Sequence, residues 1–283
     1  MSEAGHSFQE NTYIFNAESA AEMTRLMMQD RVITNEMRGL LPDTIDPTMI
    51  HKVLDLACGP GGWALDVASA YKHMEVMGID LSEKMVNYAN SRKWPNTTFR
   101  TMDIRQPLDF ADNTFDFVNA RLLLTFMPKE AWPQLLRECM RITRPGGFVR
   151  LTESEAAISN SPAFEKIQVM TAHSLYLTGR TFSPIGSQIG ITPMLGSFLR
   201  NAGYQNIQHT AFAIDFSADG DAYGAMYQTF QIGFLLSQPV LLKMNPISET
   251  ELVELCNTAI QEMQSADFRA VWYCLSVWGN KPV

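Results

Sequence analysis

The fold is decided by one stretch of this chain, Lys52-Val53-Leu54-Asp55-Leu56-Ala57-Cys58-Gly59-Pro60-Gly61-Gly62-Trp63-Ala64. Its first half, 52–57, is apolar around one aspartate and is typical of a buried strand. The glycines then turn the chain into a helix predicted from about 63 to 71. Because glycine has no Cβ, the backbone of such a unit can approach an adenosine-type ligand. By itself the motif is weak, since Gly59-x-Gly61-x-x-Ala64 also fits a relaxed nicotinamide-dinucleotide fingerprint.

The alternation of strand and helix continues downstream. Further apolar runs typical of strands lie at 75–79, 97–102, 115–120 and 146–152. Helices are expected between them, at 82–92 and from Pro128 to about 143. Strands that alternate with helices form a parallel, doubly wound, Rossmann-like α/β sheet.

Additional helices are expected at both ends of the chain. Residues 1–45 form a predicted N-terminal helical arm, in which apolar side chains at helical spacing stop at Pro42. The remainder, 46–283, is read as one domain with helical insertions near 156–190 and 218–266. Two late strands are expected at 207–215 and 268–278. Insertions of this kind commonly form a lid over a substrate pocket.

Composition excludes several classes of protein. The 283 residues include 22 Lys and Arg against 30 Asp and Glu, a net charge of −8 that disfavours a nucleic-acid partner. Hydrophobic residues make up 46%, as in globular proteins, and no uninterrupted apolar run is long enough for a membrane span. The four cysteines lie far apart without paired histidines, so no metal site is expected. The first residues lack the features of a leader peptide, which makes the cytoplasm the expected location.

Two further aspartates stand where strands are predicted to end. Asp80 follows the second strand, from which a carboxylate can accept both hydroxyls of a ribose. Asp103 follows the third strand, from which a carboxylate can accept an adenine amino group. Either one alone could be an ordinary helix-terminal or turn aspartate. Together with the glycine loop they mark one edge of the sheet, where open α/β sheets bind ligands.

At this point the chain resembles a known family. Asp55 to Gly61 is similar to the D-x-[GA]-x-G-x-G motif of class I S-adenosylmethionine-dependent methyltransferases, with Ala57 at the first glycine position. The family's next two motifs are matched by Asp80-Leu81 and Asp103-Ile104. The turn Arg144 to Gly147 resembles the family's entry into its fifth strand. The resemblance extends over about 50–155, and it implies a seven-stranded sheet with an antiparallel closing strand beside the fifth.

The resemblance implies S-adenosyl-L-methionine as the cofactor and S-adenosyl-L-homocysteine as its product. The residues implied for the methionine part are Asp55, Ala57, Gly59, Gly61, Ala120 and Arg121. The residues implied for the adenosine part are Asp80, Leu81, Asp103 and Ile104. Within that second set, Asp80 would hold the ribose and Leu81 one adenine face. Tyr13 of the arm would close over the cofactor, although plain packing of the arm explains it equally well.

The sequence does not identify a general base. A sulfonium methyl is already a strong electrophile, so the enzyme mainly has to place a nucleophile in line and exclude water. His173, His209 and Glu153 are the candidate bases, and each has an ordinary structural role as its alternative. The fragment after the fourth strand lacks the signature of nucleic-acid aminomethyltransferases, and no carboxylate cluster points to a catalytic metal.

The acceptor is expected to be small and largely apolar, because the predicted insertions are rich in Phe, Tyr, Met and Leu. The hypothesis is an enzyme, of the kind found in secondary metabolism, that methylates an O or N nucleophile, or a C nucleophile, in a water-excluded pocket. Its partner would be this acceptor, without nucleic acid or membrane, and it would act as a monomer or homodimer. The alternatives are an NAD-dependent oxidoreductase and a cofactor-bound protein that transfers no methyl group.

Overall fold

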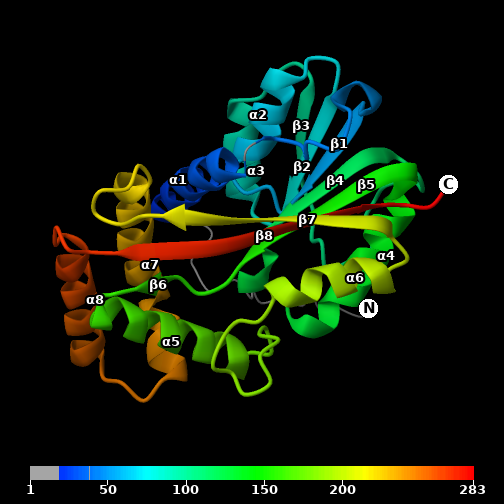
Figure 1. Ribbon diagram of the computed structural model, residues 1–283. Coiled ribbons are helices and arrows are strands. Elements are labelled where there is room, and N and C mark those ends of the chain that lie inside the picture. Colours follow the sequence, from blue (N-terminus) through cyan, green and yellow to red (C-terminus); the bar gives the residue numbers. More distant parts are fainter. Residues whose placement is uncertain (1–18, 38) are drawn as a thin grey trace, which may run out of the picture.

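The computed structural model describes residues 19–37 and 39–283, and the predicted contact of Tyr13 lies outside them. Its centre is a twisted mixed sheet in the order β3-β2-β1-β4-β5-β8, with β7 paired to the free side of β8 (Figure 1). The strands are β1 (Lys52–Leu56), β2 (Glu75–Asp80), β3 (Thr97–Thr101), β4 (Phe115–Arg121), β5 (Thr143–Ser154), β7 (Gln205–Asp215) and β8 (Ala270–Asn280). The first five are parallel, and β8 is antiparallel between β5 and β7. The predicted doubly wound sheet with an inserted antiparallel last strand is confirmed.

One strand was not expected from the sequence. The two-residue strand β6 (Ile158–Ser159) pairs with the beginning of β8, where Ile158 faces Val271 in register. It continues the line of β5 along the same side of β8. A pairing of two residues leaves no periodic signal in a sequence, so only the folded chain shows it.

Helices cover both faces of the sheet, in the order that the sequence pattern predicts. These helices are α2 (Gly62–Ala70), α3 (Glu83–Ser91), α4 (Trp132–Ile142) and α6 (Leu195–Asn201). Alternate residues of β1 point to opposite faces, so Val53 packs in one core with Trp63 of α2, and Leu54 in another core with Leu135 of α4. Because both faces are covered, four of the five residues of β1 are buried.

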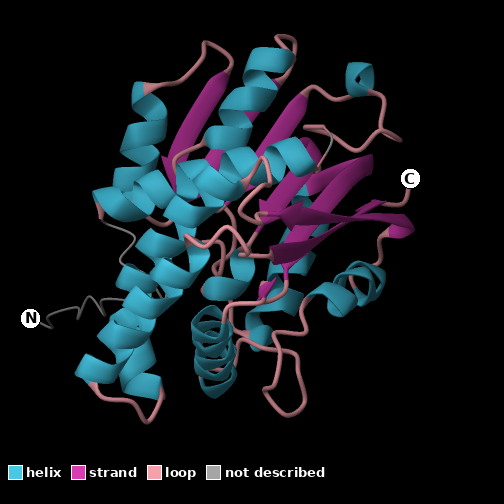
Figure 2. Ribbon diagram, turned by 60° about the vertical axis from the view of Figure 1, so that its left-hand side comes forward, coloured by secondary structure: helices cyan, strands magenta, loops and turns pink. Residues whose placement is uncertain are grey.

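A third core lies beyond the ends of the strands. It is built by α1 (Ala20–Glu36), α5 (Pro162–Leu177), α7 (Tyr223–Met244) and α8 (Glu249–Met263), together with residues of β7 and β8. Figure 2 shows helices gathered beside the strands of the sheet. The Phe164 ring lies at its centre, with ring centroids 4.8 Å from Phe230 and 5.6 Å from Phe234. Such edge-to-face pairs add to the free energy gained by burying the rings. These helices form a wall opposite the carboxyl ends of the strands.

The buried face of α1 is not the apolar one that the sequence indicated. The helix buries Glu22, Arg25 and Gln29 together with Val32 and Ile33. Glu22 is fully buried and forms a double hydrogen bond with Arg25, with both nitrogen to oxygen distances 2.7 Å. Gln29 accepts a further bond from Arg25 at 2.8 Å. Polar residues occupy this face because each one has a partner on the same helix.

No helix within residues 19–37 and 39–283 combines the length and the apolar character needed to cross a lipid bilayer.

Candidate functional site

A cavity of about 450 Å³ opens at the carboxyl ends of the parallel strands. One half is formed by the segments that follow β1, β2, β3 and β4, and the other by α1, α5 and α7. Eight of the residues predicted for the cofactor line it: Asp55, Ala57, Gly59, Asp80, Leu81, Asp103, Ile104 and Arg121. Its size and position are those of a small-molecule site at the edge of an open α/β sheet.

The glycine loop holds an unusual backbone. Ala57, Gly59 and Gly61 all have positive φ angles, of 52°, 54° and 80°. A side chain is strained in this region, so Ala57 stores a small amount of conformational energy at the cavity wall. Gly61 is not among the residues that line the cavity, and a Cβ added to it would approach the Phe99 ring and Ala89 to 2.8 and 2.9 Å. Close packing therefore requires glycine at this position, and the contact of its backbone with a cofactor stays a prediction.

Asp80 ties the glycine loop to the next helix. Its Oδ2 accepts from the amide of Gly59 at 2.8 Å and its Oδ1 from the amide of Ser82 at 2.8 Å. Each carboxylate oxygen can accept more than one hydrogen bond, so Asp80 can also meet ligand hydroxyls in the cavity. Leu81 beside it is 44% exposed while it lines the cavity, and so offers an uncovered apolar surface there.

The carboxylate of Asp103 accepts hydrogen bonds from Arg105, a residue that the sequence did not single out. Arg105 donates from Nε to Oδ1 at 2.9 Å and from Nη2 to Oδ2 at 2.8 Å, and its amide also donates to Oδ1. Burial disfavours the charge on Asp103, but the hydrogen bonds from Arg105 outweigh it and lower the pKa of this carboxyl. An adenine amino group would share Asp103 with Arg105 or displace it. Ile104, between them, is buried and forms an apolar part of the wall.

The carboxylate of Asp55 is oriented by hydrogen-bonded side chains of other strands in the sheet. Asn119 Nδ2 donates to its Oδ1 at 2.7 Å, and Arg150 Nε donates to Asn119 Oδ1 at 2.8 Å. Burial raises the pKa of Asp55 to about 6, against the opposing charge of Arg121. Burial likewise lowers the pKa of Arg150 to about 9. This chain of buried groups fixes the direction of the Asp55 carboxylate before any ligand arrives.

Ala120, predicted to lie beside the methionine part, is absent from the cavity wall. Its side chain is 1% exposed and packs in the core on the α4 face of the sheet. The next residue, Arg121, does line the cavity. Successive side chains of a strand point to opposite faces, and this alternation separates the two.

The arm helix α1 supplies cavity residues that the sequence reading missed. Leu26, Gln29, Asp30 and Ile33 lie on one face of α1 and line the cavity. Asp30 forms an ion pair with Arg121, and Arg121 also donates to Thr34 Oγ1 at 3.1 Å. The spacing of these residues was visible in the sequence, but nothing in it showed which face of α1 meets the sheet.

The half of the cavity beneath α5 and α7 is mainly apolar. Its apolar wall comes from Ile167, Leu175, Ile189, Met226, Phe230 and Phe234. Three hydroxyls face it as well, those of Thr171, Thr229 and Ser237, and each donates to a carbonyl of its own helix. Because those protons are already engaged, the hydroxyl oxygens are placed to accept hydrogen bonds.

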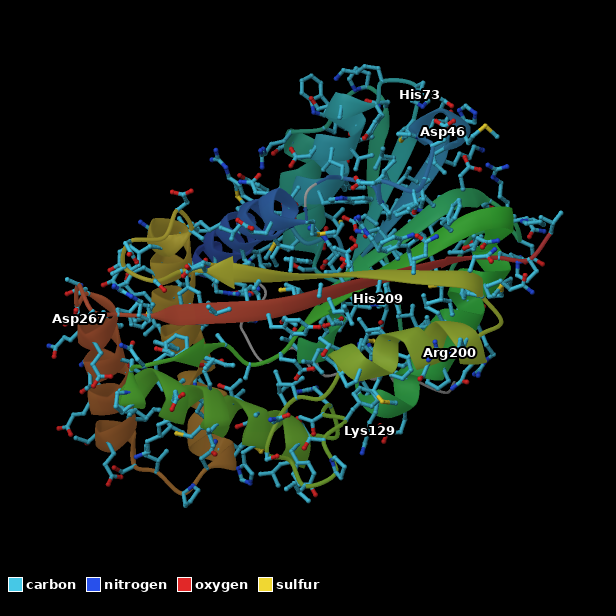
Figure 3. All side chains as sticks on the ribbon, viewed as in Figure 1. Asp46, His73, Lys129, Arg200, His209 and Asp267 are labelled. Carbon is cyan, nitrogen blue, oxygen red and sulfur yellow. The ribbon has the colours of Figure 1, made fainter. Side chains whose placement is uncertain are left out.

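None of the three candidate bases lines the cavity. His209 is exposed on the edge strand β7 (Figure 3), and His173 lies on α5 with its Nδ1 3.1 Å from Asn245 Oδ1. Glu153 is buried behind the wall, where its Oε1 accepts from the amide of Leu123 at 2.7 Å. Its neighbour Glu155 does face the cavity, but its oxygens accept three hydrogen bonds from Gly190 and Thr192. A base role is therefore unsupported for these histidines and for Glu153.

Within the described part of the chain, no three His, Cys, Asp or Glu side chains gather as metal ligands would.

Comparison with known proteins agrees with this geometry. Residues 53–147 match the sequence profile of a family described as methyltransferase domain. The chain is 28% identical over 145 residues to the secondary metabolism regulator LAE1 of Cochliobolus heterostrophus, a match that covers 50% of this chain and 45% of that protein. It is 27% identical over 221 residues to the methyltransferase pytC of Aspergillus terreus, which covers 74% of this chain and 62% of that one. These matches thus span about half to two thirds of the curated relatives.

The fold is also similar to that of a solved structure. It matches the solved structure of phosphoethanolamine N-methyltransferase 2 of Haemonchus contortus in complex with S-adenosyl-L-methionine. The TM-score is 0.53 at 17% identity, with 93% of this chain and 57% of that chain covered. The profile identifies residues 53–147 as similar to a methyltransferase domain, and the strand order and the motif residues at the cavity agree with the class I S-adenosylmethionine-dependent methyltransferases.

Proposed function

We propose that this chain transfers a methyl group from S-adenosyl-L-methionine to an O or N nucleophile, or a C nucleophile, of a small and largely apolar metabolite. The observation that carries the proposal is the continuity of the cavity. A single hollow joins the family's cofactor motifs, at Asp55, Asp80 and Asp103, to the apolar wall beneath α5 and α7. Cofactor and acceptor would therefore meet in one continuous cavity.

The residues present fit such a cofactor. When bound, it would supply an electrophilic methyl group on a sulfonium. Asp80 has acceptor capacity for the ribose hydroxyls, while the exposed side of Leu81 matches a flat, apolar adenine face. The Asp55 carboxylate, oriented by Asn119 and Arg150, matches a positively charged group.

The acceptor half of the cavity would act mainly by shape. Apolar walls such as Phe230 and Phe234 exclude water and hold an acceptor against the methyl group, which is the larger part of what this reaction requires. Thr171, Thr229 and Ser237 would accept hydrogen bonds from O–H or N–H groups and so orient the acceptor. We infer that the insertions carrying α5 and α7, near 156–190 and 218–266, serve as the lid, with helix α1 of the predicted 1–45 arm completing it.

We expect an acceptor that needs no base from the enzyme. Glu155 faces the cavity, and its oxygens already accept three hydrogen bonds from Gly190 and Thr192. An acceptor whose nucleophile is a neutral amine, or a hydroxyl acidic enough to ionise in water, needs no enzymic base. Such acceptors are the ones we expect.

The second candidate is a cofactor-bound protein without methyl transfer. What favours it is that one relative carries the name of a regulator. The NAD-dependent alternative loses its support, because the matched family is one of methyltransferases and β8 is inserted antiparallel between β5 and β7. The cytoplasm, secondary metabolism and a monomeric or homodimeric state remain part of the proposal.

The test has two stages. Calorimetric titration with S-adenosylhomocysteine, with NAD in parallel, should show binding of the former alone. Transfer from methyl-labelled S-adenosylmethionine is then measured on three panels of apolar compounds: phenols, amines and β-dicarbonyls. Labelled product from one panel supports the proposal and identifies the atom. Cofactor binding without product from any panel favours the second candidate, and binding of NAD alone refutes both.

A further inference from the structure

One ion pair joins the arm helix to the sheet inside the cavity. Asp30 of α1 pairs with Nη2 of Arg121 at the end of β4. The two side chains are 12% exposed for Arg121 and 17% for Asp30, and both line the cavity. Charges withdrawn this far from water need a partner of opposite sign, because removing one partner leaves the other unpaired at a large cost.

The pair lies directly over the glycine turn. A methyl group at Gly62 would collide with the carboxylate of Asp30, and the guanidinium of Arg121 is 5.8 Å from the centre of the Trp63 ring. Gly62 is the first residue of α2, so the Asp30 carboxylate faces the N-terminal end of that helix, where negative charge is favoured. The missing side chain at Gly62 makes room for Asp30.

Asp55 supplies a third charge at this end of the cavity. Among the charges that act on its pKa, Arg121 lowers it and Asp30 raises it, so the three groups lie within electrostatic reach of one another. The carboxylates of Asp30 and Asp55 and the guanidinium of Arg121 all line the cavity. A ligand that brings one carboxylate and more than one positive group matches this arrangement, and the amino-acid end of a sulfonium cofactor is such a ligand.

The inference rests on the cofactor of the proposed function. We propose that Arg121 binds the α-carboxylate of the methionine moiety and that Asp30 binds its α-ammonium. Each residue exchanges its partner in the protein for one in the ligand, so both charges stay paired and the cost of opening their ion pair is offset. Arg121 can meet the carboxylate with two parallel N–H groups. The arm helix α1 is thereby a part of the cofactor site, through a residue outside the family's motifs.

The test compares two ligands that differ only at the amino-acid end. S-adenosylhomocysteine carries that end, whereas 5′-methylthioadenosine keeps the adenosine and the thioether without it. Calorimetry is run on the full chain as wild type, Asp30→Asn and Arg121→Gln. The matched control is Asp66→Asn. Asp66 is exposed on α2, and the charges of Asp30 and Arg121 both act on its pKa, but it does not line the cavity.

We expect Asp30→Asn and Arg121→Gln to weaken S-adenosylhomocysteine binding by roughly 10- to 100-fold, as for the loss of a charged hydrogen bond. Binding of 5′-methylthioadenosine should change by less than about threefold, which also shows that the variants are folded. Equal losses for both ligands, or no loss for either, would overturn the roles of Asp30 and Arg121 and leave the proposed function intact. Failure of the wild type to bind either ligand would refute the proposed function and these two roles with it.

Discussion

Replacing Glu153 by glutamine should make the protein more stable, and the gain should grow with pH. Glu153 is 1% exposed on β5. Its Oε1 accepts from the Leu123 amide, and its Oε2 has no hydrogen-bond partner among the described residues. Burial raises the pKa of this carboxyl to about 8, from 4.5 for the free side chain. The folded protein therefore holds a proton here at neutral pH that the unfolded chain releases.

The sign and size of the effect follow from this proton. Below pH 4.5 both states are protonated, and Glu153 adds no pH dependence. Above that value the folded state binds more protons than the unfolded state, so stability falls as pH rises, until Glu153 ionises near pH 8. The slope is roughly 1.4 kcal/mol per pH unit, which amounts to about 3 kcal/mol by pH 7. Glutamine keeps an oxygen for the Leu123 amide and does not titrate.

Urea unfolding at pH 5, 6, 7 and 8 measures the difference between wild type and Glu153→Gln. The extra N–H group of glutamine can shift the variant by a constant amount, so the diagnostic quantity is the change of the difference with pH. The matched control is Glu165→Gln on the exposed side of α5, which should follow wild type. A difference that stays flat from pH 5 to 8 would show that Glu153 is ionised in the folded protein, against this reasoning.

Three more outcomes follow from the site. Asp80→Ala should weaken S-adenosylhomocysteine binding by roughly 100-fold in calorimetry, since it removes a ribose acceptor and the support of the glycine loop; an unchanged affinity would place the ribose elsewhere. Gly62→Ala should lower the free energy of unfolding by about 1–3 kcal/mol, measured by thermal unfolding, and by far less in an Asp30→Ala background. An equal loss in both backgrounds would show that the collision with Asp30 is not the cause. Glu155→Ala should release the 178–190 loop, so that limited proteolysis there speeds up about tenfold or more, and equal rates would show that other contacts hold it.

The cofactor half of the site could be foreseen because its residues are tied to strand ends. Asp55, Asp80 and Asp103 each stand in or just after an apolar run, and parallel strands bring such positions to one edge of a sheet. Strand and helix periods are local properties of the chain. The antiparallel closing strand beside the fifth then followed from the resemblance that these motifs carry.

Side-chain direction and long-range contacts limited the prediction elsewhere. Gly61 and Ala120 were expected at the cofactor, yet neither is among the residues that line the cavity. Arg105 covers Asp103 because a turn brings it back to the carboxylate two residues earlier. The sequence indicated that these residues lie near the binding edge of the sheet, but not which of their atoms face the cavity.

The sequence by itself determined the class of fold, the glycine loop and the acidic residues at the strand ends, since these depend on local periodicity and on fixed spacing. Only the tertiary structure decided that α1 lies over the glycine turn, that Asp30 meets Arg121, and that His173, His209 and Glu153 stay outside the cavity. Asp30 and Arg121 are 91 residues apart along the chain. Such contacts arise from the packing of whole helices against the sheet, and no local pattern specifies which face of a helix is buried when polar residues can be buried in pairs.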